Sequence, residues 1–417
     1  MLALLCFGCL SMVSSTQAKQ ADELFKTYSS ALVQIKSINI GSGQKSSIGT
    51  GFFISESGRI VTNYHVISGF VQTPDKFRLE YIDEQEQKFP VTVIAVDVIN
   101  DLALLQTENI SPTYFNLAKK PPVKGADLFA LGNPHDLGMI VVPGTYNGIK
   151  QNSFNERIHF TGSINSGMSG GPTVDKQGDV VGINVATAGN QIGFLVPVIK
   201  LQRLVEHAGE GQAASEDDLI ASIREQLIDN QNALFEQLIQ NDWQSQKLGD
   251  ANVLKELADF MPCWGNSNKD KEKTKFISAS SNCSLDERVY LSNNLTTGHV
   301  LVGFSWIKSD SLTELQLSNL YANTLNQNYG RNNAKQEDVT NYHCAEDFVE
   351  NSTNDEFKSV TCVRAYRKYE GLFDVTYRSL LLGKENQALV SRYTLQGVTE
   401  QTANNFFNKF VESVSWQ

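Results

Sequence analysis

Residues 32–197 are built of short β-type runs separated by Gly, Asn and Pro, and this pattern limits the fold more than any other feature of the chain. Within one run, Phe77, Leu79 and Tyr81 alternate with polar residues, as they do in a strand with one buried face. Many short strands at this spacing predict an all-β barrel or sandwich. We predict strands at Leu32–Ile38, Gly51–Ser55, Phe77–Ile82, Lys88–Val96, Leu102–Gln106, Leu128–Leu131, Ile158–Phe160, Val180–Ala186 and Phe194–Pro197.

The β pattern ends near residue 205, and the remainder of the chain is of a different kind. Residues 208–214 are small and polar, as in a linker, and Ser215-Glu216-Asp217-Asp218 resembles a capping box ahead of apolar residues at helical spacing. Residues 250–417 mix strand-like runs with two helical ones, which predicts an α+β domain. The predicted order is a leader (1–18), an all-β domain (19–205), a helical linker (206–249) and the α+β domain (250–417).

The N-terminal segment predicts export. Residues 2–13 are apolar but too short to span a bilayer, and the small and polar residues up to Ala18 are typical of a signal-peptide cleavage site. We therefore expect a periplasmic or secreted protein with no stable membrane insertion once the leader is removed. Lipid attachment at Cys9 is a weaker alternative. The net charge of −11 makes nucleic acid a poor candidate for a partner.

Four cysteines remain after removal of the leader, and an even number in an exported protein predicts disulfides. Four cysteines allow three pairings, of which we favour the two between nearest neighbours along the chain. The alternative of free thiols in a cytosolic protein depends on the leader prediction being wrong. No C-x-x-C or H-E-x-x-H spacing occurs, so no metal site is predicted. The favoured pairs are Cys263–Cys283 and Cys344–Cys362.

Three segments of the β region carry residues suited to nucleophilic catalysis. They hold His65 in Thr62-Asn63-Tyr64-His65-Val66, Asp101 ahead of an apolar run, and Ser169 in a Gly-rich loop. A serine hydroxyl needs a base near pKa 7, and the base needs a carboxylate to fix its tautomer. We therefore predict the triad His65, Asp101 and Ser169. Asp97, four residues before Asp101, is a rival that fits the end of a strand better.

The glycines around Ser169 allow the turn Gly167-Met168-Ser169 to form an oxyanion hole. In this interpretation the N–H groups of Gly167 and Ser169 point at one spot, where the carbonyl oxygen of a substrate gains negative charge. One such donor stabilises the transition state by about 3–4 kcal/mol.

The order His, Asp, Ser, with the motifs G-T-G-F, T-N-x-H-V, D-L-A-L-L and G-x-S-G-G-P, resembles the trypsin-like serine peptidases and in particular their HtrA/Deg-type branch. The segments Ala130–Pro134 and Gly193–Pro197 also match that branch. The resemblance covers about residues 30–200. It implies a chymotrypsin-like fold of two six-stranded antiparallel β-barrels, with the triad in the cleft between them and with no cofactor and no ATP.

The chain departs from this family at several positions. Met168 stands where HtrA-type enzymes usually carry Asn and trypsin-type zymogens carry Asp, so activation by a new N-terminus is not expected. The resemblance places the substrate pocket at Ser163, Asn184, Val185 and Ala186, and the neutral Ser163 suggests a small or apolar P1 residue. Residues 206–417 show no PDZ signature, which leaves open whether the chain forms a homo-oligomer as HtrA proteins do.

Three functions are consistent with these features. The favoured one is an exported serine endopeptidase acting on polypeptides, including misfolded proteins of the cell envelope. The second is a substrate-binding or holdase-type module with gated or weak catalysis. The third is a specialised processing protease whose C-terminal domain recruits one target. All three triad positions are occupied, which favours the enzyme.

Overall fold

The computed structural model describes residues 12–187, 193–268, 274–285, 287–325 and 333–417. The chain divides into two compact units, residues 1–223 and residues 224–417, and the boundary falls inside a long helix. The predicted leader falls largely outside the described residues. None of the described helices is both long enough and apolar enough to cross a bilayer.

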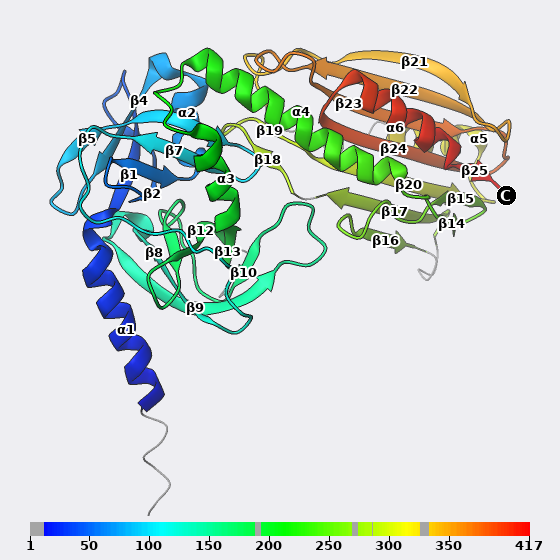
Figure 1. Cartoon of the computed structure of the whole chain (residues 1–417). Helices are drawn as coiled ribbons and strands as arrows, with labels where there is room; N and C mark the ends of the chain where they lie inside the picture. The colour runs from blue at the N-terminus through cyan, green and yellow to red at the C-terminus, as the bar shows by residue number, and fades with distance from the viewer. Residues whose placement is uncertain (1–11, 188–192, 269–273, 286, 326–332) are drawn as a thin grey trace, which may run out of the picture. The chain divides into compact units, whose positions relative to one another are not determined.

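The N-terminal unit contains two β-structures that follow one another along the chain (Figure 1). Its helices are α1 (Met12–Tyr28), α2 (Tyr64–Gln72), α3 (Val198–Ala208) and the start of α4 (Glu216–Gln240). The strands of the first sheet are β1 (Leu32–Asn39), β2 (Lys45–Phe53), β3 (Arg59–Thr62), β4 (Phe77–Ile82), β5 (Lys88–Pro90), β6 (Thr92–Asp97) and β7 (Leu102–Gln106). Those of the second are β8 (Asp127–Gly132), β9 (Ile140–Ile149), β10 (Ile158–Phe160), β11 (Pro172–Val174), β12 (Val180–Thr187) and β13 (Gly193–Pro197).

The second structure is a closed barrel of six strands, in the order β10-β13-β12-β11-β8-β9, as the chymotrypsin-like fold requires. The first is a seven-stranded sheet with the order β5-β4-β1-β2-β3-β7-β6, not the closed six-stranded barrel that was expected. Its two edge strands, β5 and β6, are separated along the chain by Val91 alone. The predicted single strand Lys88–Val96 is thus divided after Pro90, whose ring removes a backbone donor.

Burial explains which strand predictions succeeded. β4, β7 and β10 have the predicted bounds, and their apolar residues are mostly buried. The pattern missed β9, an exposed or half-buried strand of mixed composition, and β11, which is only three residues long. Short or solvent-facing strands have no strong alternation of apolar and polar residues, so periodicity cannot detect them.

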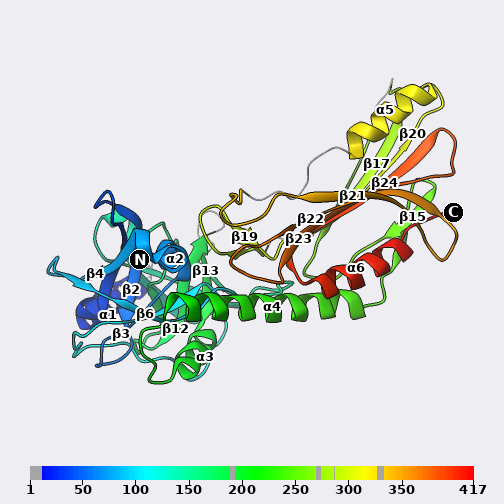
Figure 2. The same cartoon turned by 90° about the horizontal axis from the view of Figure 1, so that it is seen from above.

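The C-terminal unit is organised around a second seven-stranded antiparallel sheet (Figure 2). The strands of this sheet, in spatial order, are β16 (Cys263–Ser267), β17 (Ile277–Leu285), β20 (Val300–Lys308), β24 (Gln387–Val398), β23 (Phe373–Leu381), β22 (Glu356–Ala365) and β21 (His343–Glu350). The other elements are β14 (Ser245–Leu248), β15 (Ala251–Leu254), β18 (Val289–Tyr290), β19 (Thr296–Thr297), β25 (Ser415–Trp416), α5 (Glu314–Leu325) and α6 (Glu400–Glu412).

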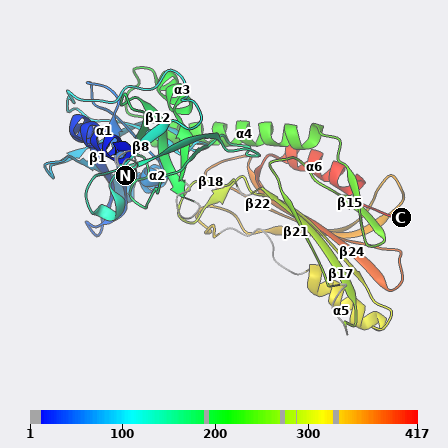
Figure 3. The same cartoon turned by 90° about the horizontal axis from the view of Figure 1, so that it is seen from below.

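The core of this unit lies between α6 and the middle of the sheet. Phe406 and Phe410 of α6 pack edge to face on Tyr393, and Phe410 also stacks on Phe304. Within the C-terminal unit, Phe235 of α4 contacts Phe406, so α4 and α6 lie side by side (Figure 3). All twelve residues of β24 are buried, because it is the central strand of the seven.

The predicted capping box of α4 is confirmed. The N–H of Asp218 donates to Ser215 Oγ (3.2 Å), and the Asp218 carboxylate accepts from the N–H of Ser215 (3.2 Å). The Ser215 hydroxyl also donates to this carboxylate (2.6 Å), and it and the Ser215 N–H lower the pKa of Asp218. The reciprocal pair satisfies donors that the first turn of a helix leaves open.

Both disulfides have the favoured pairing, Cys263 with Cys283 and Cys344 with Cys362. Each joins an edge strand of the large sheet, β16 or β21, to its inner neighbour at directly opposite positions. These edge strands are largely exposed. Without the disulfides, a single ladder of backbone hydrogen bonds would attach each of them to the sheet. The bridges therefore tie down both edges of the sheet.

A buried ion pair links β22 to β23. Asp374 is fully buried, accepts from Nε and Nη2 of Arg364 (2.8 and 2.6 Å), and accepts from the Tyr366 hydroxyl (2.7 Å). Burial raises the pKa of Asp374 by more than Arg364 lowers it. Removal of the carboxylate from water is therefore unfavourable, and its hydrogen-bond partners offset that free-energy cost.

We expect Asp374→Ala to destabilise the C-terminal unit by about 3–5 kcal/mol, because Arg364 loses the carboxylate that offsets its charge. All four tryptophans lie in residues 224–417, so urea unfolding followed by tryptophan fluorescence reports this unit alone. Asp347→Ala, on the exposed strand β21, is the control and should change stability by under about 0.5 kcal/mol. The double variant Arg364→Met/Asp374→Leu should recover most of the loss. A loss for Asp374→Ala no larger than that of Asp347→Ala would contradict the assignment.

Candidate active site

The three predicted triad residues occupy three loops or element ends of the N-terminal unit. His65 is in the first turn of α2, Asp101 directly precedes β7, and Ser169 lies in the loop between β10 and β11. The nucleophile loop packs closely on the segment that leads into α2. The N–H of Thr50 donates to the Ser169 carbonyl (2.8 Å), and a Cβ placed on Gly170 would lie 2.8 Å from the backbone nitrogen of Asn63. A larger residue than glycine therefore does not fit beside the nucleophile.

Asp101 is joined to His65 through both carboxylate oxygens. Oδ2 lies 2.6 Å from His65 Nδ1, and Oδ1 accepts the backbone N–H of His65 at 2.8 Å. The backbone of Asp101 has φ of 62°, a left-handed conformation that is unfavourable for a residue other than glycine. Its carbonyl is held by the Asn63 side-chain amide (2.7 Å) and the N–H of Tyr64 (3.2 Å). The surrounding bonds thus fix both the backbone and the carboxylate.

The pKa of His65 lies above its usual value. Burial lowers this pKa, but the negative charge of Asp101 and its hydrogen bond to the ring raise it by more. The side chain of His65 is 31% exposed and that of Asp101 is 15% exposed, so this attraction is only partly screened by solvent. The arrangement favours the imidazolium, which is the form that a general base takes during proton transfer.

The rival carboxylate, Asp97, has a different role. Its Oδ1 accepts the N–H of Asn100 (2.9 Å) and its Oδ2 accepts the Asn100 side-chain amide (2.7 Å). Asp97 therefore closes the turn between β6 and β7. Asp101, not Asp97, is the carboxylate bonded to His65.

The Ser169 hydroxyl donates to the carbonyl of Val185 at 3.3 Å. A hydroxyl has one hydrogen, so the proton that points at Val185 must be redirected before a base can remove it. Catalytic hydrogen bonds are often long or poorly aligned without a substrate. Gly171, two residues after Ser169, accepts from the N–H of Asn184 (2.9 Å) and donates to the Met168 carbonyl (3.0 Å), so the loop itself is well anchored.

The backbone of the nucleophile loop leaves two amides for an oxyanion. Within the described residues, the N–H groups of Gly167 and Ser169 make no hydrogen bond. Met168 is a correction to the predicted set, because its N–H donates to the Asn165 carbonyl (3.0 Å) and its side chain is fully buried. Gly167 and Ser169 therefore remain as the predicted pair of donors.

The predicted pocket residues differ in exposure. Ser163 is exposed and Val185 is half-buried, while the side chain of Ala186 lies outside the described residues. Asn184 is fully buried, and its amide nitrogen donates to the carbonyls of Leu131 (2.9 Å) and Met168 (3.3 Å). The Asn184 side chain therefore braces the nucleophile loop from behind and does not line a pocket.

Two residues within the quoted motifs have roles that the sequence alone did not reveal. Thr50 Oγ1 donates to the Gly167 carbonyl (2.7 Å) and accepts the N–H of Asn133 (3.0 Å). Asn63 fixes the carbonyl of Asp101, as described above. Both residues are completely buried, and their presence inside G-T-G-F and T-N-x-H-V was the only signal available.

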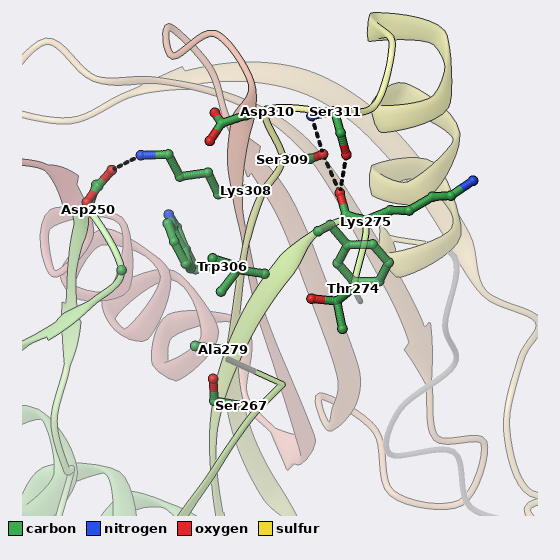
Figure 4. Close-up of a pocket in the computed structure, with 13 residues that line it drawn as sticks. Asp250, Ser267, Thr274, Lys275, Ala279, Trp306, Lys308, Ser309, Asp310 and Ser311 are labelled. Carbon is green, nitrogen blue, oxygen red and sulfur yellow. Dashed lines mark hydrogen bonds and ion pairs between the residues drawn. The ribbon is translucent and has the colours of Figure 1, made fainter. Parts of the chain in front are cut away.

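A separate cavity of about 730 Å³ lies in the C-terminal unit (Figure 4). Its lining includes Trp306 and Lys308, Lys308 donates to Asp250 (3.2 Å), and the hydroxyls of Ser309 and Ser311 donate to the Lys275 carbonyl (2.6 and 3.0 Å). None of the predicted site residues lies in this cavity.

The fold and this site together define the N-terminal unit as a trypsin-like peptidase domain. Residues 49–183 match the family model described as "Trypsin-like peptidase domain". This domain is similar to the HtrA-type trypsin-like serine peptidases.

Two similar proteins show how far the likeness extends along the chain. A "Probable periplasmic serine endoprotease DegP-like" of Chlamydia pneumoniae is 31% identical over 169 residues, covering 38% of this chain and 33% of the relative. "Protease Do-like 5, chloroplastic" of Arabidopsis thaliana is 30% identical over 190 residues, covering 40% of this chain and 58% of the relative. The chain thus spans about a third of the Chlamydia protein. A solved structure, a serine endoprotease from Yersinia pestis, aligns with a TM-score of 0.40 and 23% identity over 45% of this chain and 66% of that one.

Proposed function

We propose that this protein is an exported serine endopeptidase that hydrolyses peptide bonds of polypeptides with His65, Asp101 and Ser169. The observation that carries the proposal is the pair of hydrogen bonds between Asp101 and His65, at 2.6 and 2.8 Å. The segment that leads to His65 packs against the loop of Ser169. Ser169 Oγ attacks the carbonyl carbon while His65 accepts its proton, and Asp101 stabilises the resulting imidazolium. The N–H groups of Gly167 and Ser169 bind the developing oxyanion, and His65 then protonates the leaving amine.

The substrates and location are part of the same proposal. The similar Chlamydia pneumoniae protein is described as a probable periplasmic endoprotease, which supports export and a role in quality control of envelope proteins. Ser163, exposed at the predicted pocket, supports preference for a small or apolar P1 residue. Polypeptides are the expected partners. Self-association of the chain is proposed from its similarity to HtrA-type proteins.

One observation favours gated catalysis as a second candidate. The Ser169 hydroxyl donates to the Val185 carbonyl, so the nucleophile is not poised toward a base in this arrangement. A chain that binds polypeptides and cleaves them only when the hydroxyl is released would combine holdase-type binding with slow turnover. The C-terminal unit, with its own cavity, would suit target recruitment.

The test is labelling of the full chain with a fluorophosphonate, followed by peptide mapping, alongside a casein-cleavage assay. We expect one covalent adduct, on Ser169, and Ser169-dependent cleavage. Labelling at another residue would remove Ser169 as the nucleophile. Binding of unfolded casein with neither labelling nor cleavage would support the holdase alternative.

A further inference from the structure

The oxyanion donor Gly167 depends on a neighbouring loop, residues 133–138, that joins β8 to β9. The N–H of His135 donates to the Ser166 carbonyl at 2.9 Å. In a trans peptide the C=O and N–H groups point in opposite directions. Because His135 holds the Ser166 carbonyl on its own side, the N–H of Gly167 is turned the other way, toward the expected oxyanion position.

The fit between this loop and Gly167 is close. Gly167 has φ of 94°, and a Cβ on it would lie 2.4 Å from the Asn133 carbonyl oxygen and 3.0 Å from the His135 nitrogen. Thr50 also joins the two segments, through the Gly167 carbonyl and the Asn133 N–H. A displacement of residues 133–135 would therefore change the orientation of the Ser166–Gly167 peptide directly.

The loop has an unfavourable backbone that needs an external restraint. His135 and Asp136 have φ of 53° and 63°, two consecutive left-handed residues that are not glycine. Such conformations cost on the order of 1 kcal/mol each and persist where neighbouring contacts hold them. The internal bonds of the loop, from Gly138 N to Asn133 Oδ1 (2.9 Å) and from Leu137 N to Pro134 O (3.0 Å), shape it but do not attach it to the first sheet.

Thr50 of β2 attaches the start of the loop to the first sheet through the Asn133 N–H, and Asp136 attaches its middle. Asp136 Oδ1 accepts from Gln34 Nε2 at 2.7 Å and Asp136 Oδ2 accepts from Lys45 Nζ at 2.7 Å. Gln34 is on β1 and is 6% exposed, and Lys45 begins β2. The two bonds run from the loop of the barrel to neighbouring strands of the first sheet.

We propose that Asp136 is a positioning residue for the oxyanion hole. Through Gln34 and Lys45 it clamps residues 133–138 to the first sheet, which keeps the His135 N–H on the Ser166 carbonyl and the Gly167 N–H available to the substrate. The kinetic part of this inference rests on the proposed peptidase function, whereas the structural coupling between the clamp and the nucleophile loop does not.

The test compares Asp136→Gly with wild type in the full chain, by hydrogen–deuterium exchange and by steady-state kinetics. Glycine accepts a φ of 63° without strain, so this substitution removes the carboxylate and does not oppose the backbone. Glu86→Gly is the matched control, because Glu86 is an exposed acid with φ of 62° outside the loop. Asp136→Asn retains an oxygen for Gln34 and serves as the conservative variant.

We expect faster amide exchange in residues 133–138 and 164–170 of Asp136→Gly, but not of Glu86→Gly. We expect kcat to fall about 10- to 100-fold with KM within about threefold, since complete loss of one oxyanion donor costs about 100- to 1,000-fold. Asp136→Asn should recover part of kcat. Lys45→Met should lower kcat by a smaller factor than Asp136→Gly does. Combining the two substitutions should lower kcat little further than Asp136→Gly alone, because both remove the same contact.

Unchanged exchange of residues 164–170 in Asp136→Gly would overturn the inference, whether or not the chain is a peptidase. With an active wild type, a kcat of Asp136→Gly equal to that of Glu86→Gly would also overturn it. A wild type without Ser169-dependent hydrolysis would instead refute the proposed function, and the exchange measurement would still decide whether the clamp exists.

Discussion

Ser169→Ala should lower kcat for peptide hydrolysis by about 10⁶-fold, to the residual rate that oxyanion binding and substrate positioning alone provide. The physical reason is that alanine has no nucleophilic oxygen, while the anchored loop keeps its shape. The carbonyl of Ser169 still accepts from Thr50, and the substitution removes only the hydroxyl that bonded to Val185. The measurement is the rate of cleavage of a fluorogenic peptide by the mature chain, with the melting temperature as a check of folding.

Ser57→Ala is the control for this variant. Ser57 is an exposed turn residue between β2 and β3, and its hydroxyl bonds only to Ser55 within the described residues. Its activity should stay within about twofold of wild type, since surface substitutions rarely perturb a protein. Cleavage by Ser169→Ala at a rate near that of Ser57→Ala would mean that another residue is the nucleophile.

Asp101→Asn should lower kcat by about 10⁴-fold. Oδ1 of residue 101 accepts the backbone N–H of His65, so the asparagine oxygen keeps that bond and its NH₂ group faces Nδ1. The NH₂ can only donate, which makes Nδ1 an acceptor and moves the ring proton to the other nitrogen. His65 in that tautomer cannot accept the proton of Ser169.

Asp101→Asn should also shift the pH dependence of kcat/KM, and the direction of the shift follows from the pKa of His65. In wild type the pKa of His65 is raised, so kcat/KM should begin to fall, as the pH is lowered, above the ordinary histidine value of about 6.5. Asp101→Asn removes the influences that raise this pKa and leaves burial, which lowers it. The acidic limb should therefore move below about pH 6.5.

Asp97→Asn is the matched control for Asp101→Asn. Asp97 closes its turn with bonds from Asn100, and asparagine can retain the one to the backbone N–H. Its kcat should stay within about threefold of wild type and its pH profile should not move. A loss of activity in Asp97→Asn as large as in Asp101→Asn would contradict the assignment of the carboxylate.

Much of the architecture was predictable from local pattern. Half-buried alternation placed β4 at its observed bounds, a continuous apolar run placed β7, and helical spacing after the Ser215 cap predicted α4. Short sequence separation favoured the pairing Cys263–Cys283 and Cys344–Cys362, which the structure contains. Polar edge strands such as β16 and β21 were not predicted, because nearly all of their residues are exposed and no apolar alternation marks them.

In the candidate site, too, some features could be predicted from the sequence and others required the folded structure. The sequence by itself determined the motifs, the order of His65, Asp101 and Ser169, and a glycine-rich turn able to expose backbone amides. Only the tertiary structure showed that the Met168 N–H is bonded to Asn165 and that the Asn184 side chain holds the nucleophile loop through the Met168 carbonyl. It also joined Thr50 to Gly167, which are 117 positions apart, and Asp136 to Gln34, which are 102 apart. Periodicity and motifs describe neighbours along the chain, whereas a hydrogen bond between distant residues exists only once the folded backbone has brought its donor and acceptor within 3 Å.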